Sequence, residues 1–267
     1  MIICHSRKFI FIHIHKTGGT SVEVALEPIL TWKDLILGSS ALGELIQPEF
    51  NRRFSLEKHS SISDVERVCG SEILSEYYVF STVRHPLDRI CSVYNFIATV
   101  IYSWAVSNTI KVRIADFLSK RGSRSAARLR QVAMALARHH AEMSARALTD
   151  ETKQKAPELT WPASIAFIST DSFSAFIRHP WLFEDRAFQT QVSQLCNKDG
   201  TSVLTSAFRI EDQARWMPIV SERIKFEISL PRLNVSPLKL ITAGSVSADD
   251  RTYIEKRFHE DYRRFGY

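Results

Sequence analysis

The sequence is poor in the features that mark secreted, membrane-bound or multi-domain proteins. It has four cysteines in 267 residues, and their spacing contains no pairing motif. It lacks an N-terminal apolar stretch long enough to target or span a membrane. It also lacks Pro-, Gly- or Ser-rich linkers, internal repeats and long low-complexity segments. We therefore expect one cytoplasmic domain over residues 1–267, with free thiols at Cys4, Cys69, Cys91 and Cys196.

Acidic residues are slightly outnumbered. The chain has 35 Lys and Arg residues against 29 Asp and Glu residues, a net charge of +6. A net positive charge is consistent with an anionic ligand but does not indicate which one. Nucleic acid is one such ligand, but helix-turn-helix, zinc-finger and RNA-binding signatures are absent and the basic residues are scattered. We therefore expect no nucleic-acid partner.

The most informative segment is KFIFIHIHKTGGTSVEV, from Lys8 to Val24. Its first part is apolar on both alternating faces, which is typical of a strand buried in a parallel sheet. Two glycines then allow a sharp turn and a close approach of the backbone to a ligand, and three hydroxyl side chains stand where the next helix presents unpaired N–H groups. The segment predicts a strand, a loop that holds phosphate or sulfate, and a helix. The residues of this loop are Lys16, Thr17, Gly18, Gly19, Thr20 and Ser21.

The residue order in this loop differs from that of the nucleotide-triphosphate loop, G-x-x-x-x-G-K-[ST]. Here the lysine precedes the glycines, so it can reach the atom that bridges a bound phosphate to a transferred group. Two alternatives stay open. One is a tight turn with a solvated lysine. The other is a nucleotide kinase or related NTPase, which would need a lysine after the glycines and an acidic Mg²⁺ ligand at a strand end.

A second anion site is predicted after the run Tyr77–Val83, whose aromatic and β-branched residues are typical of a strand. Pro86 fits the first position of the following helix. Arg84 then lies at the carboxyl end of the strand, and Ser92 lies about 9 Å along the helix from Pro86. An arginine fork and a hydroxyl can converge on one phosphate.

Together, HIHKTGGTSV and VFSTVRHPLDRICSVYNF resemble the paired signatures of the sulfotransferase superfamily. The likeness is to its carbohydrate-type branch, which includes heparan sulfate 2-O-sulfotransferase and many bacterial members. It implies an α/β fold with a central parallel sheet flanked by helices and a P-loop-like nucleotide site. It also implies 3′-phosphoadenylyl sulfate (PAPS) as the cofactor, with 3′-phosphoadenosine 5′-phosphate as its product. Residues 16–21 would bind the 5′-phosphosulfate, and Arg84 and Ser92 the 3′-phosphate.

One position departs from the family pattern, because His15 stands where proline usually precedes the lysine. The loop is then less rigid, or His15 contacts the cofactor. His13 and His15 share one strand face, so a two-histidine metal site is an alternative. No Cys, His or carboxylate follows at metal-ligand spacing, and we therefore expect no metal.

His59 is the candidate general base. Ser63 and Glu66 predict a capping box, which places His59 in the loop before a helix. Bacterial relatives carry a similar K-H-[AS]-x segment, and the resemblance implies that its histidine takes the proton of the acceptor hydroxyl. Lys16 would then neutralise the charge that grows on the leaving phosphate. A solvated loop histidine is the alternative.

Later segments predict two more strands and two more helices. Ser164–Ser169 and Val203–Phe208 have strand composition, and Phe173–Ile177 opens a helix between them. Ser247 and Asp250 resemble a capping box ahead of one closing helix. The apolar side of that helix is formed by Tyr253, Ile254, Phe258, Tyr262 and Phe265.

Two short segments resemble further family elements. LPRLNVS matches the L-P-x-x-N-x-S loop near the nucleotide, so Asn234 and Ser236 are cofactor-binding candidates, with a polar turn as the alternative. FRIED resembles a shifted R-x-E-[DN] segment, which makes Glu211 a structural or acceptor-site candidate. The ending DYRRFGY is similar to the D-x-x-x-F-G-Y ending of this branch.

The acceptor is the least determined part of the prediction. A long helix is expected from Ala126, and its basic face is either an acceptor lid for an anionic glycan or a solvated surface. We expect residues 98–160 to form a helical insertion and the acceptor to be a hydroxyl of a carbohydrate or glycan. A lipid or natural-product hydroxyl is the alternative on the same fold. The oligomeric state is not predicted.

Overall fold

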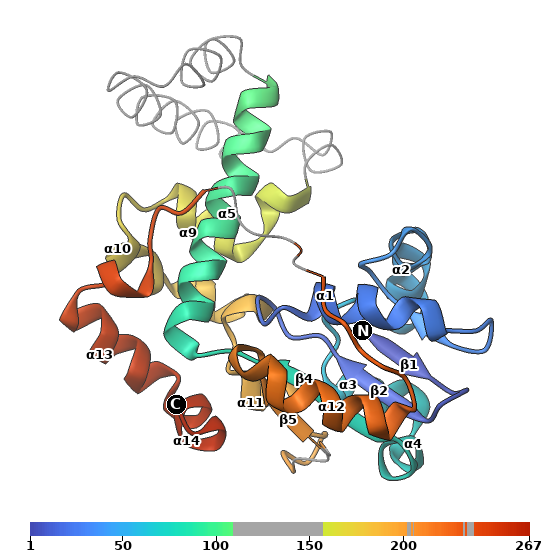
Figure 1. Ribbon diagram of the computed structural model, residues 1–267. Coiled ribbons are helices and arrows are strands. Elements are labelled where there is room, and N and C mark those ends of the chain that lie inside the picture. Colours follow the sequence, from blue (N-terminus) through green and yellow to red (C-terminus); the bar gives the residue numbers. More distant parts are fainter. Residues whose placement is uncertain (109–156, 202–203, 205, 232, 234–237) are drawn as a thin grey trace. The chain divides into compact units, whose positions relative to one another are not determined.

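The computed structural model describes residues 1–108, 157–201, 204, 206–231, 233 and 238–267 (Figure 1). The chain divides into two compact units. The first contains Met1–Arg89, Gln189–Val235 and Arg251–Tyr267, and the second contains Ile90–Phe188 and Ser236–Asp250. A single domain over the whole chain stays a prediction. The helix expected from Ala126 lies outside the described residues.

The first unit is built on a mixed five-stranded sheet with the order β3-β1-β2-β4-β5. The three strands β2, β4 and β5 are parallel, whereas β1 pairs antiparallel with both of its neighbours. The expected all-parallel sheet is therefore wrong at this edge. Only residues 5–8 connect β1 to β2, and so short a connection allows a hairpin but no parallel crossover. The strands are β1 (Ile2–Cys4), β2 (Phe9–Ile12), β3 (Leu35–Ile36), β4 (Tyr78–Val83) and β5 (Ser206–Arg209).

The central strands are buried on both faces, as their apolar runs predict. In β2, Ile10 and Ile12 join the hydrophobic cluster of one face, and Phe9 and Phe11 join that of the other. Side chains of α1 and α12 complete the cluster around the phenylalanines. Side chains of α2, α3 and α4 complete the cluster around the isoleucines. These helices are α1 (Gly19–Leu26), α2 (Ala41–Phe54), α3 (Ile62–Cys69), α4 (Ser71–Glu76) and α12 (Gln213–Ile224).

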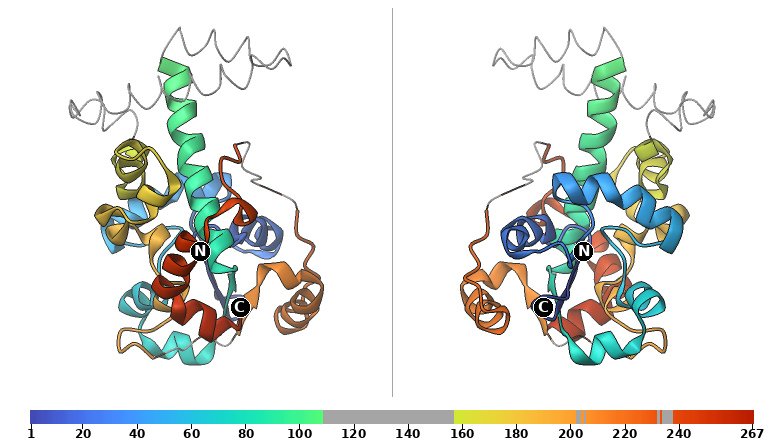
Figure 2. Two further views of the ribbon diagram at one scale, coloured as in Figure 1. Left: turned by 90° about the vertical axis from the view of Figure 1, so that its left-hand side faces the viewer. Right: turned by 90° about the vertical axis from the view of Figure 1, so that its right-hand side faces the viewer.

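The second unit is mainly helical. Its longest described helix, α5 (Pro86–Asn108), starts at Pro86, as predicted (Figures 1 and 2). Tyr94 of this helix packs its ring against Phe167, Phe173 and Phe176 at centroid distances of 5.0–5.3 Å. The other elements of this unit are η2 (Pro157–Thr160), α9 (Pro162–Ile168), α10 (Phe173–Ile177), η3 (Pro180–Glu184), η4 (Arg186–Phe188) and η6 (Ala243–Ser245).

One predicted strand is a helix. The segment expected as strand Ser164–Ser169 forms most of α9, which starts at Pro162 in its favoured first helical position. Five of its seven residues are buried, so the sequence shows a short apolar run without helical periodicity. The helix at Phe173–Ile177 is confirmed. The strand expected at Val203–Phe208 is confirmed from Ser206 onward, where β5 begins.

The start of α3 and the closing helix differ from the prediction. The capping box of α3 is formed by Ser61 and Asp64 instead of Ser63 and Glu66, and it still leaves His59 in the preceding loop. Ser247 and Asp250 do cap α13 (Ala248–Arg257). The single closing helix is wrong, because Phe258 leaves the helical conformation and separates α13 from α14 (His259–Phe265).

Three short elements complete the first unit: η1 (Glu27–Ile29), α11 (Gln191–Gln194) and η5 (Ile210–Asp212). Within the described residues, no helix is both long and apolar enough to cross a membrane.

Candidate active site

The loop between β2 and α1 has the tight backbone that an anion site needs. Gly18 is the N-cap of α1 and has a φ of 83°, in the left-handed region that favours glycine. Lys16 also has a positive φ, 64°, which is an uncommon backbone conformation for a residue other than glycine. At Gly19 a Cβ atom would overlap the ring of His13. The start of α1 is therefore closely packed at both glycines, because a Cβ at Gly18 would lie 2.9 Å from the side chain of Ile210.

The hydroxyl residues of this loop differ in their surroundings. Thr17 is fully buried, and its Oγ1 donates a hydrogen bond to the carbonyl of Ile14 at 3.0 Å. Its hydroxyl thus stabilises the turn from inside. Thr20 and Ser21 are partly buried in the first turn of α1. Their contact with an anion, like that of Thr17, stays a prediction.

Lys16 and Arg84 come together although 67 positions separate them in the sequence. Nη1 of Arg84 donates a hydrogen bond to the carbonyl of Lys16 at 3.4 Å. Burial, followed by the charges of Arg84 and Lys58, lowers the pKa of Lys16 to about 8. Lys16 therefore lies close enough to two other cations to feel their charges, an arrangement that an anion would stabilise.

His59 lies next to the end of β2 and contacts two other histidines. Its Nδ1 is 2.8 Å from the backbone carbonyl of His13, which can only accept a hydrogen bond. Nδ1 must therefore carry the proton, and Nε2 keeps its lone pair. Burial first, and then His15 and His13, lower the pKa of His59 well below its ordinary value. At neutral pH this imidazole is a neutral group with a free acceptor nitrogen.

Rings enclose His59 on two sides. The ring of His15 is stacked on it, with centroids 3.5 Å apart and planes inclined by 24°. The ring of His13 meets it edge-on at 4.6 Å. The prediction that His13 and His15 share a strand face is wrong, because β2 ends at Ile12 and both residues lie after it. Their contact with His59 joins segments that are distant in the chain.

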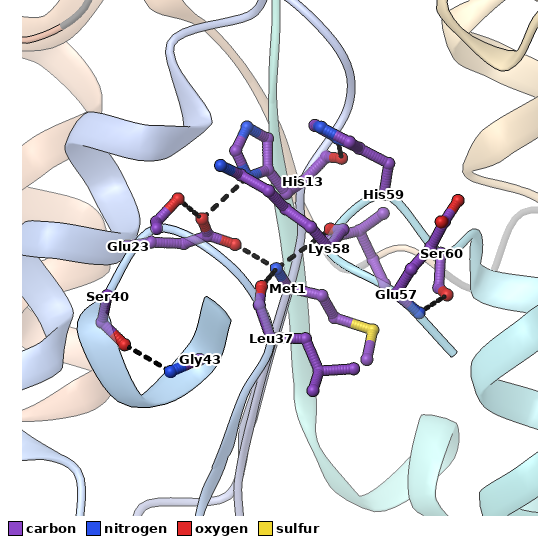
Figure 3. A network of polar contacts seen from close by, with 12 residues as sticks. Met1, His13, Glu23, Leu37, Ser40, Gly43, Glu57, Lys58, His59 and Ser60 are labelled. Carbon is purple, nitrogen blue, oxygen red and sulfur yellow. Dashed lines mark hydrogen bonds and ion pairs between the residues drawn. The ribbon is translucent and has the colours of Figure 1, made fainter. Parts of the chain in front are cut away.

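Glu23 fixes His13 from the opposite side (Figure 3). The carboxylate is fully buried and accepts a hydrogen bond from Nδ1 of His13 at 2.8 Å, and the amino group of Met1 and the hydroxyl of Ser39 also donate to it. Burial opposes its ionisation, but His13 and the Met1 amino group prevail and lower the pKa of Glu23 to about 2. Sequence reasoning missed this residue. Its signal was a carboxylate between two valines of α1.

Lys58 is the second residue that sequence reasoning missed. Its backbone N–H donates to Oε1 of Gln47 at 2.8 Å, and its carbonyl accepts from the amino group of Met1 at 3.0 Å. Its aliphatic chain crosses Gly38, where a Cβ would lie only 2.5 Å from Cδ of the lysine. The side chain extends toward the ring of His13 (Figure 3). The ammonium of Lys58 also lies 3.8 Å from the carboxylate of Glu44, so its charge is partly compensated.

Arg84 follows β4, as predicted, and a buried amide holds its backbone. Gln191 accepts from the N–H of Arg84 and donates to its carbonyl, both at 2.9 Å. Asp261 in turn accepts from the backbone N–H groups of Gln191 and Val192 at 2.9 Å. Burial raises the pKa of Asp261, and the buried Arg89 opposes that rise. The carboxyl end of β4 is thereby fixed by α11 and α14.

Glu211 has a structural role in this unit. Its carboxylate accepts from the backbone N–H of His85 at 2.9 Å and from the hydroxyl of Tyr267 at 3.1 Å. Arg209 lies over the ring of Tyr267 at 4.6 Å and donates to the carbonyl of Phe265 at 2.8 Å. The FRIED segment and the FGY ending therefore support the residue next to Arg84.

The remaining predicted residues are placed as follows. Ser92 lies on α5 in the second unit and is half-buried, and its pairing with Arg84 stays a prediction. Asn234 and Ser236 lie outside the described residues. In the part of the chain that the structure describes, no group of three or more His, Cys, Asp or Glu residues is arranged to hold a metal ion.

Comparison with protein families decides the class. A family model described as "Sulfotransferase family" matches residues 1–267. The chain belongs to the sulfotransferase family. Neither the curated proteins nor the solved structures gave a match. This sulfotransferase is thus an α/β enzyme of sulfuryl transfer, and anion binding by the loop after β2 and by the arginine after β4 stays a prediction.

Proposed function

We propose that this sulfotransferase moves the sulfuryl group of PAPS to a hydroxyl of a carbohydrate or glycan, with His59 as the general base. The observation that carries the proposal is the hydrogen bond from Nδ1 of His59 to the carbonyl of His13. This bond fixes the tautomer and leaves Nε2 free to take a proton. The low pKa of His59 keeps the ring neutral at physiological pH, when a base is needed.

The residues of the loop fit a phosphosulfate. Gly18 has the left-handed backbone that such a loop uses, and in the described part of the chain no side chain caps the start of α1 with a hydrogen bond. Lys16 and Arg84 supply positive charge beside the N-terminal N–H groups of α1. Thr20 and Ser21 stand in the same turn, and Ser92, Asn234 and Ser236 remain candidates for the nucleotide end.

In the proposed reaction, PAPS supplies the sulfuryl group on a phosphosulfate bond. Nε2 of His59 takes the hydroxyl proton as the acceptor oxygen forms its bond to sulfur. The bond from sulfur to the phosphate oxygen breaks, and its electron pair stays on that oxygen. Lys16, with the N-terminus of α1, stabilises this charge. His13 holds His59 in position, and Glu23 holds His13.

The test is sulfuryl transfer from labelled PAPS to a panel of glycan, lipid and small-molecule acceptors, with products identified by mass spectrometry. His59→Ala should lower kcat by about a hundredfold or more and leave binding of 3′-phosphoadenosine 5′-phosphate unchanged. Lys16→Ala should lower kcat to a similar extent and also weaken binding. His5→Ala and Lys33→Ala, at exposed positions, are the matched controls.

Three results would contradict parts of the proposal. Full activity of His59→Ala would remove the base. Transfer only to lipid or small-molecule hydroxyls would replace the glycan. If ATP with Mg²⁺ bound and stabilised the protein while 3′-phosphoadenosine 5′-phosphate did neither, the nucleotide assignment would be wrong.

A further inference from the structure

His15 stacks its ring on that of the candidate base. Its imidazole is nearly parallel to that of His59 with 3.5 Å between the centroids. His15 belongs to the loop after β2, whereas His59 belongs to the loop before α3. The stack is therefore a tertiary contact between two loops, and a movement of either loop would break it.

The stack completes the set of constraints on the His59 ring. The hydrogen bond to the His13 carbonyl fixes Nδ1, and the edge of the His13 ring covers one side. The torsion about the last side-chain bond of a histidine is intrinsically broad, and the hydrogen bond at Nδ1 restricts it from one edge of the ring. The flat face of His15 restricts that rotation, so the direction of Nε2 depends on it.

The stack also couples two proton acceptors. Two imidazolium rings at van der Waals distance would place like charges together, so protonation of one opposes protonation of the other. His15 is the first charge, after burial, that lowers the pKa of His59. The charged and titratable groups that surround His59 are His13, His15, Lys58, Glu23 and the amino group of Met1.

We propose that His15 is a positioning residue: its ring sets the orientation of His59, and its proton competes with the proton that His59 accepts. This inference rests on the proposed role of His59 as the base. It explains why a titratable aromatic ring fits a position next to the anion-binding lysine. An apolar residue at position 15 would remove the charge that lowers the pKa of His59. His59 would then be protonated at higher pH, and the pH range in which it acts as a base would be narrower.

Two substitutions separate the ring from its charge. His15→Phe keeps a flat aromatic face and removes the proton site. His15→Ala removes both. His5→Phe is the matched control, because His5 is an exposed histidine that also contacts an aromatic ring, that of Tyr77.

The first measurement is an NMR pH titration of the His59 imidazole, which needs neither cofactor nor acceptor. We expect His15→Phe to raise the midpoint by ~0.5 pH unit or more, and His5→Phe to leave it unchanged. An unchanged midpoint in His15→Phe would overturn the coupling.

The second measurement is the pH profile of sulfuryl transfer. In His15→Phe the acid limb of kcat/KM should move to higher pH by the same amount, while the plateau stays within about threefold of the parent. In His15→Ala the plateau kcat should fall about tenfold, since the ring of His59 loses its orientation. A plateau unchanged in His15→Ala would overturn the positioning role.

The two proposals fail in different ways. Full activity of His59→Ala removes the base, whatever the titration shows. An unchanged titration midpoint in His15→Phe removes the coupling alone and leaves His59 as the base.

Discussion

At the scale of single residues, Gly19 carries the strictest steric requirement in the loop. A methyl group at this position would overlap the ring of His13, which cannot move aside because Glu23 holds its Nδ1. We expect Gly19→Ala to destabilise the protein by about 1–3 kcal/mol and to abolish sulfuryl transfer. Thermal unfolding and activity measure the two effects.

Gly244→Ala is the control for this prediction, because a Cβ there meets only the Thr242 hydroxyl at 3.9 Å. It should keep both the melting temperature and the activity. A Gly19→Ala protein of normal stability and full activity would show that His13 is not packed against the loop.

Lys16 gives a prediction for the alkaline side of the pH profile. The pKa of Lys16 is lowered to about 8, so the free enzyme loses this charge as the pH rises through that value. The proposed role of Lys16 at the leaving group needs the protonated form, and kcat/KM should therefore fall above about pH 8. In Lys16→Arg the limb should disappear from the accessible range, since arginine stays charged. Lys33→Arg is the control, and a limb that persists near pH 8 in Lys16→Arg would assign it to another group.

The individual residues most accessible to sequence reasoning were those inside a continuous motif. Lys16, Gly18 and Gly19 lie in one loop, and turn chemistry alone places them at the start of a helix. Glu23 was missed because two of its three hydrogen-bond donors, Met1 and Ser39, lie outside the motif. The stack of His15 on His59 was missed because it joins two separate loops. Contacts of that kind depend on tertiary packing, which no local pattern encodes.

At the scale of elements, the junction of β4 and α5 is held by the carboxylate of Glu211, which lies in η5, directly after β5. Glu211 accepts hydrogen bonds from the N–H of His85 and the hydroxyl of Tyr267. We expect Glu211→Ala to loosen the backbone next to Arg84 and to weaken binding of 3′-phosphoadenosine 5′-phosphate about tenfold. Calorimetry measures the binding, and kcat at saturating cofactor should change little.

Two variants bracket this prediction. Tyr267→Phe removes one of the two hydrogen bonds and should give an intermediate effect. Glu222→Ala, at an exposed position of α12, should give none. Unchanged binding in Glu211→Ala would show that Arg84 does not depend on this support, or does not bind the nucleotide.

The elements could be predicted where residue pattern and boundary signals agreed. The run before Arg84 and the proline at position 86 specify β4 and the start of α5 correctly. The segment Ser164–Ser169 failed because a short helix buried on most sides has the composition of a strand. The strands Ile2–Cys4 and Leu35–Ile36 are too short to show a period, so the antiparallel edge of the sheet was not expected.

At the scale of the whole molecule, the family was predictable because the two motifs expected to bind anions follow neighbouring parallel strands. β2 pairs with β4, so the loops after them end at the same edge of the sheet and bring Lys16 to Arg84. The acceptor was not predictable, since the residues expected to meet it follow no motif. Anion loops report the shared chemistry of a family, and acceptor-binding surfaces vary with each substrate.

The stability of the first unit at acid pH depends on Glu23. The carboxyl has a pKa of about 2 in the folded protein against an ordinary 4.5. The unfolded chain therefore takes up a proton first as the pH falls, so the stabilisation is complete above pH 4.5 and is lost between 4.5 and 2. A shift of this size corresponds to about 3 kcal/mol. We expect the free energy of unfolding of the parent protein to fall steeply in this range.

Glu23→Gln removes the titration and the charge that holds His13. At pH 7 it should be less stable by about 3 kcal/mol, and its remaining stability should depend less on pH between 4.5 and 2. Glu27→Gln, an exposed neighbour on the same segment, should follow the parent curve. Denaturant unfolding at several pH values measures all three proteins. Parallel curves for the parent and Glu23→Gln would mean that the His13–Glu23 pair contributes no pH-dependent stability, and the orientation of His59 would then need another source.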